Sequence, residues 1–468
     1  MSYDDSSFDR LAGERDDPPQ QASDRRSRFQ RDRDRIIYST AFRRTAGKTQ
    51  VVAVEEFGLY HTRLTHSLKV AQLGRRLAES LRTLHTDRNP GFVGDPAPPD
   101  PDLVEAACLA HDLGHPPFGH IGEESLTAAF DELAHRQRHP HQRIRLRPER
   151  AIRKLGGFEG NAQTFRILTY LSARVPLDPR CGLNLTRAAL DAATKYPWPR
   201  VHGFTTEEKW GAIELDRPTL EWVRQGVPSS RARIKSFEAQ LMDWCDDVTY
   251  AVHDMVDFYR GGFIPLEILF APEGDAPNYR PGEEALRLMP IAQRDHGHSL
   301  DDVREAWQAL VPLVEIFEPW KPSREVRAAT QRVTSQLITY FVGEIDYTGD
   351  APCTHAGDLV LHRDLDEARL RRVAADFLKS ILREFVIRSP AFAVQQRGQG
   401  HIVRSLLRMY CESDDLLPLD RQEDLEHHGD RLRAATDHVA SLTEQDAHAL
   451  YERLTGYRLG ALTDTLAT

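Results

Sequence analysis

Long apolar runs, paired cysteines and an excess of positive charge are all missing from this chain of 468 residues. No run reaches the ~18 apolar residues that a membrane span needs, and the N-terminus lacks a signal-peptide core, so we expect a cytoplasmic protein without a membrane partner. The five cysteines are an odd number without a C-x-x-C pair, which favours buried thiols over a disulfide framework. The net charge of −10 excludes a broad cationic surface for nucleic acid.

Alternating strand patterns and internal repeats are absent as well, and the fold class we predict is all-α. Residues 1–30 hold few large aliphatic side chains and are predicted to form a disordered tail. A helical core is expected over residues 31–265, followed by a helical C-terminal region over residues 266–468 with an accessory or oligomerisation role. The His- and Arg-rich residues 131–150 fit either a solvated insertion or a basic flap over an anionic ligand.

The most informative stretch follows an apolar run from Leu103 to Leu109 that predicts a buried helix. The next residues gather imidazoles and carboxylates within a Pro- and Gly-rich turn, namely His111, Asp112, His115, His120 and Glu123. A core helix does not need such an ending, whereas a metal site does. Histidine and aspartate are usual ligands of divalent metals, and further His and Glu side chains nearby can act as acid and base.

Two other stretches carry residues of the same kind on inward faces. His66 begins a stripe with Val70, Leu73 and Leu77, as in an amphipathic helix. Adjacent helical residues point about 100° apart, so His111 and Asp112 can share one ion only if their helix ends there, and Gly114 supplies the ending.

The third stretch is WCDDVTYAVHD, in which Asp246, Tyr250 and Asp254 recur every four residues and share one face of a helix. Each of these residues alone has an ordinary structural explanation, such as a core histidine, a capping aspartate or a core tyrosine. The informative feature is that ligand residues occur on three separate predicted helices.

Five segments of the sequence resemble those of a known family. The segments HTRLTHSLKV, HDLGHPPFGHIGEESL, GFEGNAQTFRILTYL, GLNLTRAALDAATKYPWP and WCDDVTYAVHD are similar to those of the bacterial deoxyguanosine triphosphate triphosphohydrolase-like proteins, which are HD-domain phosphohydrolases. The similarity runs from about Arg33 to Gly262. It implies an HD-domain helical bundle that binds a divalent metal ion, such as Mn²⁺ or Mg²⁺. The implied ligands are His66, His111, Asp112 and Asp246.

The resemblance also implies roles for residues around the metal. Three of them would act on the reacting phosphate and the leaving group: His120, Glu123 and His115. Six others would bind substrate: Arg63 and Lys195 through phosphates, Tyr250 and Asp254 through the deoxyribose, and Gln50 and Asn161 as part of the nucleotide pocket.

The implied reaction splits a deoxynucleoside triphosphate (dNTP) into the deoxynucleoside and inorganic triphosphate. Two alternatives stay open: an HD-type phosphohydrolase acting on another nucleotide, and a non-catalytic HD protein that senses nucleotides. Cyclic-dinucleotide hydrolases carry a Gly-Tyr-Pro signature soon after the His-Asp pair, and this sequence has none there. The resemblance further implies a homo-oligomer, with hexamers common among relatives, and a dNTP or DNA as allosteric effector.

Overall fold

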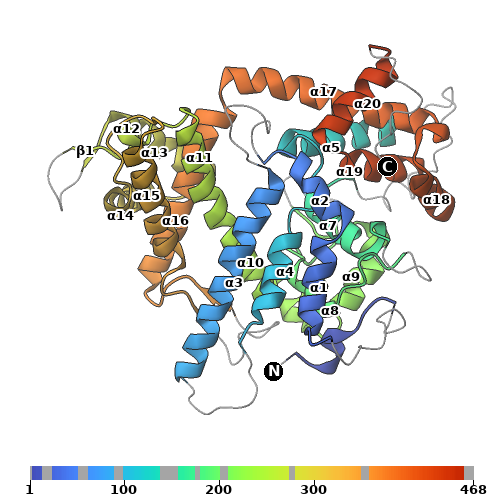
Figure 1. Cartoon of the computed structure of the whole chain (residues 1–468), viewed down its shortest axis with the longest axis horizontal. Coiled ribbons are helices and arrows are strands. Elements are labelled where there is room, and N and C mark those ends of the chain that lie inside the picture. The colour runs from blue at the N-terminus through green and yellow to red at the C-terminus, as the bar shows by residue number, and fades with distance from the viewer. Residues whose placement is uncertain are drawn as a thin grey trace.

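The computed structural model describes residues 3–12, 24–50, 62–88, 98–136, 157–173, 180–200, 209–273, 280–348 and 358–457, and it is built from helices (Figure 1). The α-helices are α1 (Arg28–Ile37), α2 (Thr40–Arg44), α3 (Arg63–Arg88), α4 (Pro101–Ala110), α5 (Gly119–Arg136), α7 (Gly160–Arg166), α8 (Arg187–Ala192), α9 (Arg217–Val223), α10 (Phe237–Thr249), α11 (Met255–Arg260), α12 (Leu266–Leu269), α13 (Glu283–His296), α14 (Leu300–Leu310), α15 (Arg324–Val342), α16 (Leu365–Leu382), α17 (Pro390–Glu412), α18 (Leu419–His428), α19 (Arg431–Ser441) and α20 (Glu444–Thr455).

The strands form two small antiparallel ribbons, β1 (Pro272–Glu273) with β2 (Arg280–Pro281) and β3 (Asp346–Thr348) with β4 (Asp358–Val360). They do not alter the all-α class predicted from the sequence, which the structure confirms. Within the described ranges, no helix is both long enough and apolar enough to cross a lipid bilayer.

Local sequence signals explain where the central helices begin. Asp100 caps α4 by accepting hydrogen bonds from the backbone N–H groups of Asp102 and Leu103, and Pro101 occupies the first turn, where a missing N–H costs nothing. Ser236 caps α10 in the same way through the N–H of Ala239. The predicted helix from Ser236 to Tyr259 is therefore present, but it is interrupted by a π-helical turn, η8 (Tyr250–Asp254).

A large apolar core holds α3, α4 and α10 side by side at the centre of the molecule (Figure 1). Leu103, Val104 and Leu109 of α4 are almost fully buried, as their apolar run predicted. The same core continues into α13, α14, α15 and α16. Apolar side chains from both sides of residue 265 therefore share one interior, and the division of the chain at this residue stays a prediction.

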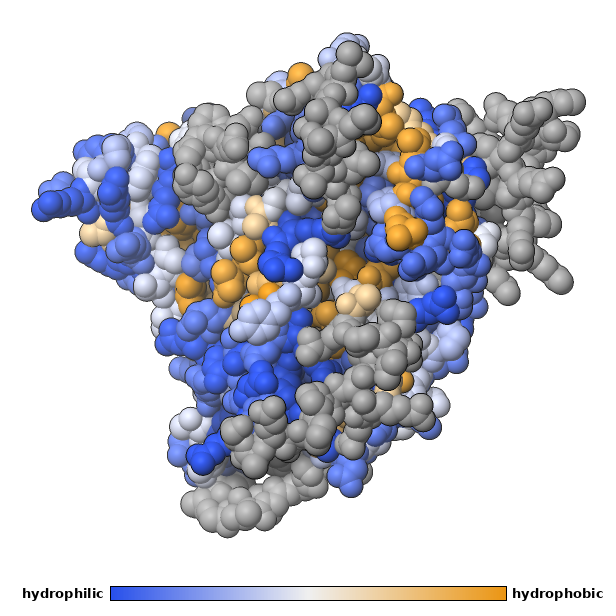
Figure 2. Space-filling view, turned by 45° about the vertical axis from the view of Figure 1, so that its right-hand side comes forward, coloured by the Kyte–Doolittle hydropathy of each residue, from blue (hydrophilic) through white to orange (hydrophobic). Residues whose placement is uncertain are grey.

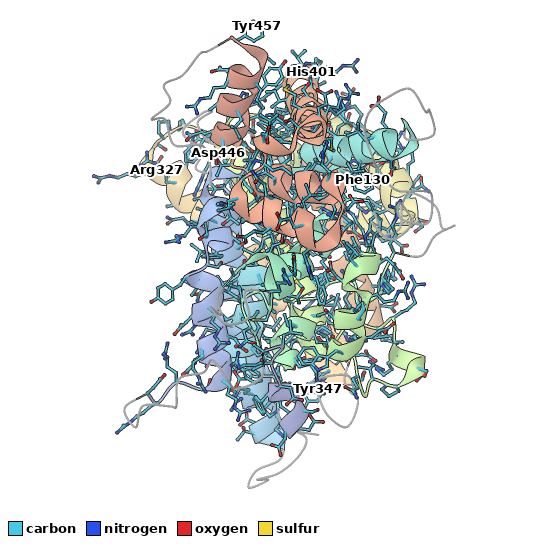
Figure 3. The ribbon with its side chains drawn as sticks, turned by 90° about the vertical axis from the view of Figure 1, so that its right-hand side faces the viewer. Phe130, Arg327, Tyr347, His401, Asp446 and Tyr457 are labelled. Carbon is cyan, nitrogen blue, oxygen red and sulfur yellow. The ribbon has the colours of Figure 1, made fainter. Side chains whose placement is uncertain are left out.

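A second apolar core lies beneath α5, where α17, α19 and α20 pack against it. Figure 3 places Phe130 of α5, His401 of α17 and Asp446 of α20 in the same half of the molecule, with Tyr347 of β3 at the opposite end. The final helices thus cover the segment that follows the His-Asp pair. On one face, apolar and strongly hydrophilic side chains meet around a central hollow (Figure 2).

Part of the segment predicted as a disordered tail, residues 1–30, lies within the described residues. Residues 3–12 include a short 3₁₀ turn, and Tyr3 and Phe8 pack edge-on or tilted against Phe29 of α1. Arg10 forms a buried ion pair with Asp32. Aromatic contacts and a buried charge pair therefore order this segment, although it has few aliphatic residues. The possible insertion or flap at residues 131–150 falls mostly outside the described residues, since α5 ends at Arg136.

Candidate active site

The His-Asp pair lies where α4 ends. The last α-helical residue is Ala110, and the turn that follows lets His111 and Asp112 point toward the same space, as expected. Gly114 was expected to supply this ending, and the structure shows a second reason for a glycine there. A Cβ there would lie 2.1 Å from the backbone nitrogen of Thr164 and 2.2 Å from the carbonyl oxygen of Gly160. Glycine is required because the backbone of α7 packs directly on this turn.

Side chains from three helices converge at this turn. His66 Nε2 of α3 lies 3.0 Å from Asp246 Oδ1 of α10. His111 Nε2 lies 3.5 Å from Asp112 Oδ1 and 3.6 Å from Asp246 Oδ1. The ligand atoms of His66, His111 and Asp112 all lie within 4.8 Å of one another, and all three residues are buried. Asp246 completes a group of two imidazoles and two carboxylates.

The hydrogen-bonding state of His111 suits a metal ligand. Its Nδ1 lies 2.6 Å from the carbonyl oxygen of Cys108, a contact that requires Nδ1 to carry the proton and donate it. In the neutral ring Nε2 then keeps the lone pair that a metal ion would take, whereas without a metal the neighbouring carboxylates favour a proton on this atom. Among the described residues this buried atom has no hydrogen-bond partner, although it lies between two carboxylates. A backbone carbonyl that fixes the tautomer in this way is the usual support of a metal-binding histidine.

The charges around the cluster favour a bound cation. Burial alone would lower the pKa of His111, but the carboxylates of Asp112 and Asp246 raise it to about 9. Burial raises the pKa of Asp112, yet Arg63, His111 and His115 together outweigh it and hold that pKa well below its ordinary value. The two acids are therefore ionised and attract positive charge to the atoms that would coordinate a metal.

Two cations flank the carboxylates. Arg63 Nη1 lies 2.7 Å from Asp112 Oδ2, with both side chains almost fully buried. Lys195 Nζ lies 2.7 Å from Asp246 Oδ2 and 2.9 Å from Asp243 Oδ1. Burial lowers the pKa of Lys195, but Asp243 and Asp246 raise it well above its ordinary value, so the ammonium is charged. Both predicted phosphate-binding residues thus lie at the metal cluster.

The predicted acid–base residues form an adjacent group on α5 and the turn before it. His115 Nδ1 lies 3.1 Å from Asp112 Oδ1, and its ring is 6.5 Å from that of His120. His120 Nδ1 is 3.8 Å from Glu123 Oε2. The His120 side chain is 63% exposed, whereas that of Glu123 is 9% exposed, so the imidazole faces open space while the carboxylate anchors it.

Two residues beside Glu123 were not among the site residues predicted from the sequence. Lys209 Nζ lies 3.5 Å from Glu123 Oε1 and 3.4 Å from Glu159 Oε1. Burial and the neighbouring Glu123 raise the pKa of Glu159 to about 7. Glu159 also caps α7 through the N–H of Ala162. Lys209 follows a polar, irregular stretch that gave no pattern, whereas the place of Glu159 immediately before a helix was a usable capping signal.

A small pocket of about 40 Å³ opens beside His120. It is lined by the expected Gln50 and Tyr250, and also by residues from α17 and its approach, namely Ile387, Phe392, Gln396 and Gln399. An aromatic ring and several carboxamides thus meet at one opening, as contact with a nucleoside would need. Tyr250 begins the π-helical turn η8, a kind of irregularity that recurs at functional sites.

The other two predicted substrate residues lie outside the lining of this pocket. Asp254 is fully buried at the far end of η8. The side-chain amide of Asn161 donates to Glu159 Oε1 at 2.7 Å. The structure therefore brings the metal, phosphate and acid–base candidates together, with Asn161 attached to them through Glu159. It adds Asp243, which lies three residues before Asp246 on α10 and was within reach of sequence spacing, and the α17 residues, which lie too far along the chain to be joined in that way.

Comparison with known proteins agrees with this geometry. Residues 63–147 match the HD domain family, and residues 367–453 match the phosphohydrolase-associated domain. HD domains define a class of helical phosphohydrolases that depend on a bound metal.

Full-length relatives narrow the class. A deoxyguanosinetriphosphate triphosphohydrolase-like protein of Streptomyces coelicolor is 37% identical, over 97% of this chain and 98% of that protein. Proteins of the same name from Corynebacterium efficiens and Corynebacterium glutamicum are each 35% identical, over 92% and 90% of this chain and the same shares of their own lengths. The chain belongs to the deoxyguanosinetriphosphate triphosphohydrolase-like family and is a hydrolase of the HD type.

Proposed function

We propose that this protein hydrolyses deoxynucleoside triphosphates, dGTP among them, to the deoxynucleoside and inorganic triphosphate. The observation that carries the proposal is the position of one pocket. The four-ligand cluster, two buried cations and a pocket lined by Gln50 and Tyr250 are neighbours, joined by His115 and His120. A triphosphate spanning this arrangement would have its α-phosphate at the metal ligands and its nucleoside in the pocket.

The metal is held, in this proposal, by His66, His111, Asp112 and Asp246. Bound there, a divalent cation such as Mn²⁺ or Mg²⁺ polarises a phosphate oxygen and lowers the pKa of a coordinated water. Arg63 and Lys195 neutralise the charge of the polyphosphate. Each is a cation already at the cluster, paired with Asp112 and Asp246 respectively, and each can also donate hydrogen bonds to phosphate oxygens.

The 5′-oxygen of the substrate is a poor leaving group and needs a proton. His120 supplies it, because its imidazole is exposed, lines the pocket and lies outside the group of metal ligands. Glu123 orients the ring, and His115 contacts the α-phosphate from the other side of the turn. General-acid assistance of this kind contributes about 10²–10⁴ in rate.

The sugar lies against Tyr250, where an added 2′-hydroxyl would meet the ring and be rejected. The resemblance assigns Asp254 to the 3′-hydroxyl and Gln50 and Asn161 to the nucleotide site; of these three residues, Gln50 lines the pocket, whereas Asp254 and Asn161 lie outside its lining. Phe392, Gln396 and Gln399 of α17 bring an aromatic face and two carboxamides to the same pocket. A carboxamide presents both a donor and an acceptor, which suits contact with more than one base.

A product assay tests the proposal. Purified protein with Mn²⁺ or Mg²⁺ is given each of the four dNTPs, singly and mixed, and the released phosphate species are separated. We expect inorganic triphosphate and the free deoxynucleoside. Release of pyrophosphate or of single phosphate would refute the assignment and favour another HD-type reaction. Nucleotide binding without any product would favour a sensor.

Oligomeric assembly and control by a dNTP or DNA stay predictions. For an anionic effector, the place to search is a second cavity whose lining includes Arg35, Arg44, Lys48 and Arg421. The order of mixing in the four-substrate assay would reveal it, because an effector makes one dNTP accelerate hydrolysis of another.

A further inference from the structure

We propose that Glu444, the first residue of α20, is a positioning residue for the active site, a role that rests on the proposed function. It lies in the C-terminal region, 326 residues from Phe118. Its carboxylate joins the two loops that carry Gln50 and His120, and so fixes the turn from which His120 projects.

Three hydrogen bonds converge on this one buried carboxylate. Glu444 Oε1 accepts from the backbone N–H of Thr49 at 2.9 Å and from that of Phe118 at 3.1 Å. Glu444 Oε2 accepts from the hydroxyl of Thr49 at 2.6 Å. Glu444 is 9% exposed, Thr49 4% and Phe118 6%. Thr49 immediately precedes Gln50, and Phe118 lies two residues before His120. Gln50 and His120 both line the pocket beside His120.

The turn held by Glu444 has an uncommon backbone. Phe118 has a φ of 66° and Gly119 a φ of 57°, so two successive residues adopt the left-handed region just before His120. A phenylalanine there needs support from its surroundings. The Phe118 N–H is bonded to Glu444, and the Phe118 ring packs edge-on against His448, one helical turn further along α20.

Contacts on either side of Glu444 hold the same loops. Lys48 Nζ donates to the carbonyl oxygens of His115 at 2.6 Å and Ala440 at 2.8 Å. Gly47 approaches α20 so closely that a Cβ on it would lie 2.8 Å from Thr443 Cγ2. The start of α20 is therefore fitted to the loop before Gln50, and it is itself fixed by a capping box between Thr443 and Asp446.

Two substitutions at Glu444 separate the effect of losing its charge from the effect of losing its hydrogen bonds. A glutamine at this position can accept both backbone N–H groups on Oε1 and donate its amide to the Thr49 hydroxyl, which accepts as readily as it donates. A leucine of similar volume can do neither, and leaves two buried N–H groups without a partner. The Glu444→Gln variant should therefore retain the turn, whereas the Glu444→Leu variant should release it.

The experiment compares these two variants with Leu450→Ala, which opens a cavity on the buried face of the same helix without touching either loop. Turnover, KM, Mn²⁺ affinity and amide hydrogen exchange are measured well below the unfolding temperature. For Glu444→Leu we expect kcat to fall by about 10²-fold, the effect of displacing a reacting group by roughly 1 Å. Mn²⁺ affinity should be unchanged, and exchange should rise in the peptides that contain Thr49 and Phe118.

Glu444→Gln should keep kcat within about 3-fold of the unmodified protein, and Leu450→Ala should unfold more easily yet keep its kcat. In a His120→Ala background, Glu444→Leu should cost little more, because both changes remove one function. Equal kcat losses in Glu444→Leu and Leu450→Ala, or full additivity with His120→Ala, would overturn the proposal. If the unmodified protein releases no triphosphate, the proposed function fails; unchanged exchange at Phe118 would separately refute the contact's role.

Discussion

His66 Nε2 and Asp246 Oδ1 lie 3.0 Å apart, although 180 residues separate them along the chain. His66 is completely buried, on a helix whose inward stripe the sequence predicted. This contact joins α3 to α10 and brings the third ligand segment to the His-Asp turn. An imidazole and a carboxylate this close are either a hydrogen-bonded pair or two ligands of one cation. The two cases predict different metal affinities when His66 is replaced.

The first prediction separates those cases. His66→Ala should abolish Mn²⁺ binding and triphosphate release, because loss of even a supporting partner costs about 10–100-fold in metal affinity and loss of a ligand costs more. Mn²⁺ should raise the unfolding temperature of the unmodified protein but not that of the variant. His85→Ala, on the same helix but bonded to Tyr347, is the control and should keep both responses. A metal-induced rise in the His66→Ala variant would exclude the proposed centre.

A second prediction concerns the acid–base group. His120→Ala should lower kcat by about 10²–10⁴ while leaving Mn²⁺ affinity unchanged, since His120 lies outside the cluster. Glu123→Gln should lower kcat less, because it weakens only the orientation of the imidazole. The measurement is steady-state release of triphosphate beside a Mn²⁺ titration. Wild-type turnover in His120→Ala would remove this residue from the mechanism.

Helix periodicity and residue type were enough to predict much of the site. The apolar run before His111, the stripe that begins at His66 and the ending of α4 each follow from local rules, and the structure contains all three. Cys108, Cys245 and Cys411 are buried free thiols, in line with the expectation of thiols rather than disulfides. These features depend on neighbours within one or two helical turns, which a sequence displays directly.

Contacts between distant segments were not predictable in this way. No sequence pattern near Glu444 predicts that its carboxylate accepts a hydrogen bond from Thr49, 395 residues away. Gly114 was expected to supply the end of its helix, and the sequence did not show that glycine is also needed because α7 packs on it. The π-helical turn at Tyr250 also breaks a pattern that reads as continuous α-helix. In each case tertiary packing, rather than local preference, decides the conformation.

A third prediction tests the role of Tyr250. Tyr250→Ala should reduce the preference for dNTP over NTP, measured as the ratio of kcat/KM values, by roughly 10-fold or more, within the range of pocket-based discrimination. The control is Tyr259→Phe. Tyr259 lies on α11, which follows η8, and it is outside the pocket lining; its hydroxyl donates a hydrogen bond to the carbonyl of Glu318. Tyr250→Phe should keep the preference because the ring remains. An unchanged ratio in Tyr250→Ala would contradict contact between this ring and the sugar.

The last prediction concerns acid stability and the link between α7 and α19. Asp437 is fully buried and bonded to Arg166 and Arg433, which are buried as well. Burial raises the pKa of Asp437, but the two guanidinium groups outweigh it and lower that pKa from 3.8 to about 2. Because the folded protein binds this proton more weakly than the unfolded chain, the ionised carboxylate stabilises the fold by about 2 kcal/mol.

That contribution is complete above about pH 4, the ordinary pKa range of aspartate, and is lost as the pH falls through the folded-state pKa near 2. Urea unfolding at several pH values should therefore show the unmodified protein to be more stable than Asp437→Asn at pH 6, with the difference shrinking by about 2 kcal/mol between pH 5 and pH 2. Asp358→Asn, whose partner Arg231 is partly exposed, should show a much weaker pH dependence. A difference for Asp437→Asn that stays constant with pH would show that the ion pairs do not favour the charged form.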